Sequence, residues 1–179
     1  MARVGVFPGS FNPPTVAHLA IAEAARSAHD LDRLVLSVSR SALAKEHVEH
    51  PPFDERIEVI EASVAHLEWL EVAVTDHQLL VDIADGFDVL VVGADKWRQI
   101  QDPVWYDGDP AARDAALARL PKIAVVPREG IEVPPALVLH VPGGAAEGVS
   151  STRARSGELH LMTPAARAHA HRTGAWRER

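Results

Sequence analysis

Short apolar runs in this chain alternate with longer segments whose apolar residues recur at helical spacing. The runs predict strands that are covered by other elements. In the first half of the chain they are Val4 to Phe7, Leu34 to Val38, Val72 to Val74, and Val89 to Val92. The last of these lies in FDVLVVGAD, contains no polar residue, and predicts the central strand.

The segments between these runs predict helices. The first begins at Thr15, a residue type suited to cap a helix, and extends to about His29. A second helix is expected from Asp54 to about Leu70. The remaining predictions are helices near 76–84, 111–120 and 164–171, and strands at 122–127 and 136–141.

This alternation of strands and helices predicts an α/β fold. Right-handed crossovers would join the strands into a Rossmann-like, doubly wound, mostly parallel sheet. A chain of 179 residues is long enough for one domain with a substantial core, so residues 1–179 are read as a single domain. Such sheets bind ligands beyond the carboxyl ends of their strands. The segments that follow predicted strands there are 8–18, 39–45, 93–97 and 143–152.

Composition and charge limit the kinds of partner and the compartment that the sequence predicts. The formal net charge of −7 offers no general attraction to nucleic acid or to an anionic membrane, so neither is expected as a partner. No apolar run approaches the roughly 18 residues that span a bilayer. The sequence has no cysteine, which fits a reducing cytoplasm and excludes thiolate metal sites. We expect a cytoplasmic protein and leave open whether it forms a homo-oligomer.

The segment GSFNPPTVAH, residues 9–18, has the properties of an anion site. Gly9 would let the backbone approach a ligand, and the helix start presents free N–H groups with a positive dipole end. Thr15 adds a hydroxyl at the cap, and His18 follows one turn later. The alternative is a Pro-rich turn with a capping threonine and a partly buried histidine.

A second segment, VSSTRAR at 149–155, combines three hydroxyls with Arg153 and Arg155 at a predicted helix start. Hydroxyls, helix N–H groups and guanidinium groups together suit a polyphosphate. On its own the segment could equally be a capped surface helix with solvated arginines. Its combination with the first segment favours the polyphosphate.

These two segments resemble the T/H-x-G-H and S-S/T-T-x-x-R elements of the nucleotidylyltransferase superfamily. They stand here as TVAH and SSTRAR. The sequence is most similar to the nicotinate or nicotinamide mononucleotide adenylyltransferases, on GSFNP near the start, GAD at 93–95, PVW at 103–105 and VVPREG at 125–130. The resemblance implies transfer of AMP from ATP to the pyridine mononucleotide, with pyrophosphate released, as a step of NAD biosynthesis.

The resemblance also implies which residues act. His18, Thr15, Lys45 and Arg155 would be catalytic, acting on the ATP phosphates. ATP would be bound by Gly9, Ser10, Phe11, Gly93, Asp95, Ser151 and Thr152, and the acceptor by Trp105, Trp97 and Arg128. Mg²⁺ would enter with ATP, held by phosphates and water without protein ligands.

A second resemblance and one departure from the family pattern keep alternatives open. FPGSFNPPT also resembles the phosphopantetheine adenylyltransferases, so another phosphorylated acceptor or a cytidylyl transfer is an alternative. Ala17 stands where the superfamily usually has glycine, which is compatible with a non-catalytic nucleotide-binding homologue. Other chemistry is disfavoured: a P-loop, G-x-G-x-x-G and G-x-S-x-G are absent, and EHVEH lacks the spacing of a zinc helix.

Overall fold

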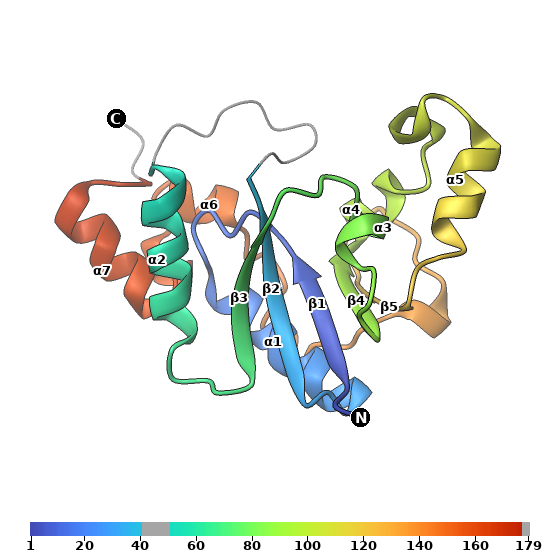
Figure 1. Cartoon of the computed structure of the whole chain (residues 1–179). Coiled ribbons are helices and arrows are strands. Elements are labelled where there is room, and N and C mark those ends of the chain that lie inside the picture. Colours follow the sequence, from blue (N-terminus) through green and yellow to red (C-terminus); the bar gives the residue numbers. More distant parts are fainter. Residues whose placement is uncertain (41–50, 177–179) are drawn as a thin grey trace.

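A parallel sheet forms the centre of the molecule (Figure 1). The structure is a computed structural model that describes residues 1–40 and 51–176. Within this part the strands are β1 (Val4–Pro8), β2 (Arg33–Ser39), β3 (Leu70–Thr75), β4 (Val89–Gly93) and β5 (Lys122–Val126). They are ordered β3-β2-β1-β4-β5, and every pair is parallel. The predicted Rossmann-like, doubly wound α/β class is confirmed.

Helices cover both faces of this sheet. The helices of the described residues are α1 (Val16–His29), α2 (Phe53–Val64), α3 (Leu80–Ile83), α4 (Ala94–Gln99), α5 (Pro110–Leu117), α6 (Ser151–Arg155) and α7 (Pro164–Thr173). Of these, α5 packs on the turn at 103–106 and α7 packs on α2. Short 3₁₀ turns lie at Pro103–Tyr106 (η1), Pro135–Leu137 (η2), Pro142–Gly144 (η3) and Leu159–Leu161 (η4). None of the helices in the described part of the chain has the length and apolar character that a membrane crossing requires.

Three apolar clusters hold these layers together. The first packs α1 and α2 on one face of the sheet, around Leu34, Leu36 and Ile60. The second packs α3 and the start of α4 on the other face, around Val6 and Leu90. The third joins α2 to α6 and α7 and places the last part of the chain beside α2 (Figure 1). A bridge between Thr15 and Met162, a member of the third cluster, brings this late part of the chain next to the loop that follows β1.

The run Val89 to Val92 is buried throughout, as expected of a strand covered on both faces. The middle position of the sheet, however, belongs to β1, which pairs with both β2 and β4. The carboxyl ends of β1 and β4 therefore lie side by side, and the chain runs to opposite sides of the sheet from them. This is the place where open parallel sheets bind ligands.

Three element predictions need correction. The strand expected at 136–141 is wrong: Val138 forms only a single bridge to Val125, after the η2 turn that follows Pro134. Leu139 donates its N–H to the Val125 carbonyl (2.8 Å) and is buried in the core, so the apolar residues of this segment serve packing rather than a continuing ladder.

The other two corrections concern helix bounds. The second helix ends at Val64 and not near Leu70, because a turn at 64–67 lets β3 begin at Leu70. The helix expected at 76–84 is only α3, Leu80–Ile83. Before it, the Thr75 hydroxyl accepts from the His77 N–H (3.1 Å) and the Ser39 hydroxyl donates to the His77 carbonyl (2.7 Å), which holds this segment outside a helix.

Candidate active site

The loop between β1 and α1, residues 9–15, positions the first predicted group. Thr15 caps α1, and its backbone N–H donates to Nδ1 of His18 (2.9 Å). The Thr15 hydroxyl lies 3.0 Å from the same nitrogen. Since Nδ1 accepts a hydrogen bond, the neutral ring carries its proton on Nε2. His18 is therefore held as a donor through Nε2.

The surroundings of the His18 ring favour this neutral form. The ring of Phe11 meets it edge-on at a centroid distance of 4.9 Å, and that of Phe7 lies at 6.2 Å. Burial among these groups lowers the pKa of His18 from 6.5 to about 4. Without a bound anion the imidazole is therefore uncharged at neutral pH, and its Nε2–H can donate a hydrogen bond to a ligand.

The second predicted group reaches the same loop from α6. Ser150 caps this helix by accepting from the Arg153 N–H (3.1 Å). The Ser151 hydroxyl then donates to the Pro13 carbonyl (2.8 Å), and the Arg155 guanidinium donates to the Asn12 carbonyl and to the Thr152 hydroxyl. Two segments separated by more than a hundred residues thus converge on one loop.

Glycine at position 9 makes room for a side chain of the protein, whereas the sequence predicted that it lets a ligand approach. A Cβ at this position would lie 2.8 Å from the ring of Phe11. The absence of a side chain therefore admits the aromatic ring that packs on His18, in addition to any role toward a ligand. Ala17, the departure from the superfamily pattern, is 4% exposed, so little of its methyl group is available to an approaching phosphate.

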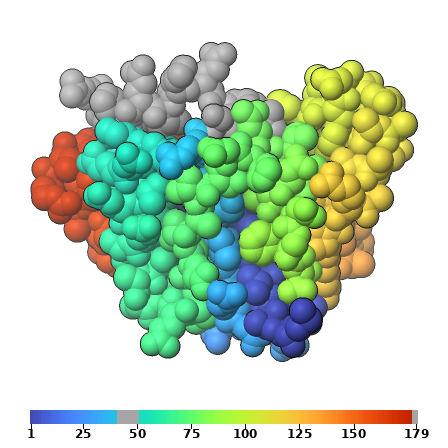
Figure 2. All heavy atoms as spheres, viewed as in Figure 1, coloured from blue at the N-terminus to red at the C-terminus, as the bar shows by residue number. Residues whose placement is uncertain are grey.

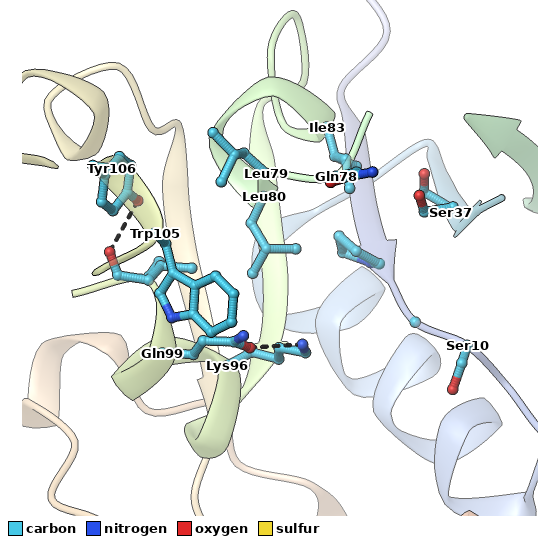
Figure 3. Close-up of a pocket in the computed structure, with 14 residues that line it drawn as sticks. Ser10, Ser37, Gln78, Leu79, Leu80, Ile83, Lys96, Gln99, Trp105 and Tyr106 are labelled. Carbon is cyan, nitrogen blue, oxygen red and sulfur yellow. Dashed lines mark hydrogen bonds between the residues drawn. The ribbon is translucent and has the colours of Figure 1, made fainter. Parts of the chain in front are cut away.

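A cleft opens at the carboxyl ends of β1 and β2, between the loop and α3, α4 and η1 (Figure 3). In Figure 2 a hollow lies on the viewed face between the segments coloured green, with blue residues of the first strands behind it. The empty space is about 740 Å³, a figure that includes the solvent in its open mouth. Its lining is mainly apolar, with Gly9 and Ser10 on one side and Trp105 on the other.

The predicted acceptor residues are distributed unevenly around this cleft. Trp105 lines it and points inward beside Leu80 (Figure 3). Arg128 forms an ion pair with Asp95, so a residue expected on the acceptor side contacts one expected on the ATP side. Trp97 packs against the second apolar cluster and is not part of the described lining.

Of the other residues predicted to act on ATP, Gly93 is described by the structure and Lys45 is not. Gly93 ends β4, and a Cβ there would meet no described atom within 4 Å, so its surface is open. Lys45 lies outside the described residues. Within residues 1–40 and 51–176 no cluster of three His, Asp or Glu side chains could hold a metal ion. Mg²⁺ stays a prediction.

Two further lining residues, Ser39 and Lys96, lie in segments that were expected at this edge but were not singled out from the sequence. The lining residues that the sequence did not indicate are Ser37, Gln78, Leu79, Leu80, Ile83, Gln99, Ile100 and Tyr106. Part of this set carries a signal in the sequence. Lys96 and Gln99 are spaced to share one face of a helix that follows a strand, and in the structure Lys96 donates to the Gln99 side chain (2.7 Å). The lining residues of α3 could not be predicted from their own segment, because their position depends on where β3 ends and how the chain continues from it.

A comparison with known protein families identifies the class of this chain. A family profile described as cytidylyltransferase-like matches residues 6–157, which include both segments that meet at the β1–α1 loop. The chain belongs to this family, within the nucleotidylyltransferase superfamily that its motifs resemble.

The individual proteins that are similar to this chain include adenylyltransferases of two kinds. A phosphopantetheine adenylyltransferase of Sphingopyxis alaskensis is 38% identical over 95 residues, which cover 51% of this chain and 52% of that protein. A probable nicotinate-nucleotide adenylyltransferase of Geobacter sp. is 40% identical over 63 residues, covering 35% and 29%. The chain thus spans about half the length, or less, of the curated relatives that it matches.

Proposed function

We propose that the protein transfers AMP from ATP to the phosphate of a small acceptor and releases pyrophosphate. The observation that carries this proposal is the convergence of His18 and Arg155 on the β1–α1 loop, where an α-helix also begins. Helix N–H groups, a neutral donor and a guanidinium together suit a triphosphate. The family assignment supports the same reaction class.

The reaction requires little covalent help from the protein. An acceptor phosphate oxygen attacks the α-phosphorus of ATP, a new P–O bond forms, and the bond to the bridging oxygen breaks, so pyrophosphate leaves with the electron pair. The acceptor phosphate is already a nucleophile, so no general base is needed. Catalysis then consists of alignment and of stabilising charge on the transferred and leaving phosphates.

We assign these tasks to the two segments. His18 would donate through Nε2–H to a phosphate oxygen, since its Nδ1 is occupied by Thr15. Arg155 would use its remaining N–H groups on the β- and γ-phosphates, beside Ser151 and Thr152. ATP would then lie across the loop, and the acceptor would enter through the cleft lined by Trp105.

A pyridine mononucleotide, nicotinate or nicotinamide, is our first candidate for the acceptor. The inward-pointing indole of Trp105 in an apolar cleft supports it, because a flat ring can stack there (Figure 3). The probable nicotinate-nucleotide adenylyltransferase of Geobacter sp. is among the similar proteins. Phosphopantetheine is the second candidate, favoured by the longer match to the Sphingopyxis alaskensis protein.

The test is pyrophosphate release from ATP and Mg²⁺ with nicotinate mononucleotide, nicotinamide mononucleotide and 4′-phosphopantetheine in parallel, with CTP as an alternative donor. We expect release with ATP and one acceptor class, together with the dinucleotide product. Binding of ATP without pyrophosphate from any acceptor would contradict the proposal and favour a nucleotide-binding homologue.

A further inference from the structure

Trp176, near the end of the chain, reaches the β1–α1 loop. It follows α7 and is 5% exposed. Its indole N–H donates to the side-chain oxygen of Asn12, which is 3% exposed and 164 positions earlier. A buried pair of this kind is costly to break, because each group would be left without its partner and away from water. Trp176 lies beyond residues 6–157, the part matched by the family profile.

The loop that receives this bond needs support from outside. Phe11 has a φ of +44°, a left-handed conformation that is unfavourable for a side chain of its size. Such a conformation persists where the surroundings fix it. Backbone carbonyls of the loop are held by Arg155, by Ser151, and by the Thr163 N–H, which donates to the Pro14 carbonyl (3.1 Å).

Trp176 adds a bond to a side chain of the loop, next to the strained residue. Asn12 adjoins Phe11, and the ring of Phe11 packs edge-on against His18. A change in the orientation of Asn12 would therefore reach the imidazole through one intervening side chain. The indole itself is anchored, with its ring 5.5 Å from that of His169 on α7.

We propose that Trp176 is a positioning residue of the active site, which sets the β1–α1 loop through Asn12 and so fixes the ring of His18. This inference rests on the proposed function for its consequence in catalysis, but not for its consequence in loop structure. The last segment of the chain would then complete the ATP site without touching ATP.

The test compares Trp176→Phe with Trp69→Phe. Phenylalanine keeps an aromatic ring and removes the N–H donor. Trp69 is the matched control, because it lies against Arg26 just before β3, at the amino end of the parallel strands, whereas the β1–α1 loop follows the carboxyl end of β1. Both variants are assayed at a temperature where circular dichroism shows them fully folded. We expect kcat to fall about tenfold in Trp176→Phe, with the acceptor KM within about twofold, and both constants to stay within about twofold in Trp69→Phe.

A second readout does not depend on activity. Hydrogen exchange of the amides at 9–18 should become about tenfold faster in Trp176→Phe, while those of β4 keep their wild-type rates. If the wild-type protein transfers no AMP, the proposed function fails and this exchange experiment still decides the present inference. Unchanged exchange at 9–18, or faster exchange throughout the protein, would overturn it.

A double-mutant cycle with Asn12→Ala isolates the bond. Asn12→Ala removes the same interaction from the loop side, and it carries the test if Trp176→Phe does not fold. Since the two substitutions break one bond, the double variant should lose about as much kcat as the worse single variant. Losses that multiply, to about a hundredfold, would contradict the inference.

Discussion

At the scale of single residues, His18 shows how a neighbouring backbone group decides what a side chain can do. The Thr15 N–H occupies Nδ1, and burial among aromatic rings lowers the pKa to about 4. Both effects leave a neutral imidazole with its proton on Nε2. The sequence predicted the pairing of a threonine cap with a histidine one turn later, but not the tautomer, because that depends on which nitrogen faces the cap.

The lowered pKa of His18 has a consequence for stability. Between pH 6.5 and about 4 the unfolded chain binds a proton at His18 that the native protein does not, so this contribution to the unfolding free energy is complete above pH 6.5 and is lost as the pH falls toward 4. From pH about 7 to about 4.5, wild type should lose roughly 2 kcal/mol more than His18→Gln. Urea unfolding of both proteins measures this difference, and parallel losses would show that His18 titrates normally.

Arg153 and Arg155 differ although they share α6. Arg155 donates to the Asn12 carbonyl of the loop, whereas Arg153 pairs with Glu158 and the Gly148 carbonyl. The resemblance of SSTRAR to the family motif predicted Arg155 as the residue that acts on phosphate. The hydrogen-bond partners of Arg153 and Arg155 could not be predicted from their spacing.

We expect Arg155→Ala to lower kcat by about 10² to 10³, as removal of one charge-stabilising donor does in other enzymes. Arg153→Ala should leave kcat within about threefold, because its guanidinium is engaged away from the loop. Steady-state pyrophosphate release measures both variants. Equal losses in the two would mean that α6 acts as a structural unit rather than through Arg155.

At the scale of elements, the sequence predicted the strands best where apolar runs are continuous. The strands at Val89 to Val92 and Lys122 to Val126 were predicted from such runs. In the structure, neighbouring residues on both faces of each strand are buried. The segment 136–141 is also rich in apolar residues and is not a strand, because its apolar side chains pack onto the core after a proline turn. Whether a run is used for pairing or for packing is decided by distant neighbours, which local patterns do not contain.

Two glycines, Gly9 in the β1–α1 loop and Gly93 at the end of β4, give contrasting predictions. Gly9→Ala would place a methyl group 2.8 Å from the Phe11 ring, forcing the ring that packs on His18 to move. It should cost about 1–3 kcal/mol of stability and reduce turnover. Gly93→Ala meets no described atom, so it should keep the wild-type melting temperature. If ATP lies against Gly93, the methyl group of Gly93→Ala should raise the KM for ATP while the melting temperature stays unchanged.

Thermal unfolding and initial rates separate the two cases. A Gly9→Ala protein with unchanged stability and turnover would show that Phe11 can move without disturbing His18.

At the scale of the whole molecule, the site is assembled from both ends of the chain. The first loop contacts α6, Thr163 and Trp176, while the cleft beside it is closed by α3, α4 and η1 (Figure 1, Figure 3). The order of the strands explains this arrangement, because the chain leaves β1 and β4 toward opposite sides. The sequence predicted the meeting of 9–18 with 149–155, but the contributions of Trp176 and α3 arise only from packing between layers.

The position of Trp105 across the cleft predicts acceptor discrimination. Trp105→Leu keeps an apolar lining and removes the stacking surface, so the KM for a pyridine mononucleotide should rise about tenfold. The KM for ATP should stay within about twofold, because the indole lies away from the β1–α1 loop (Figure 3). A rise in the KM for ATP alone would place the nucleotide, rather than the acceptor, against Trp105.

The central claim is that one triphosphate is held from two sides by segments far apart in the sequence. A crystal structure with Mg²⁺ and an ATP analogue that resists transfer tests it most directly. Our account predicts Nε2 of His18 and the guanidinium of Arg155 within hydrogen-bond distance, about 3 Å, of oxygens of the same triphosphate. A triphosphate bound elsewhere, or one that contacts only one of these two residues, would contradict it.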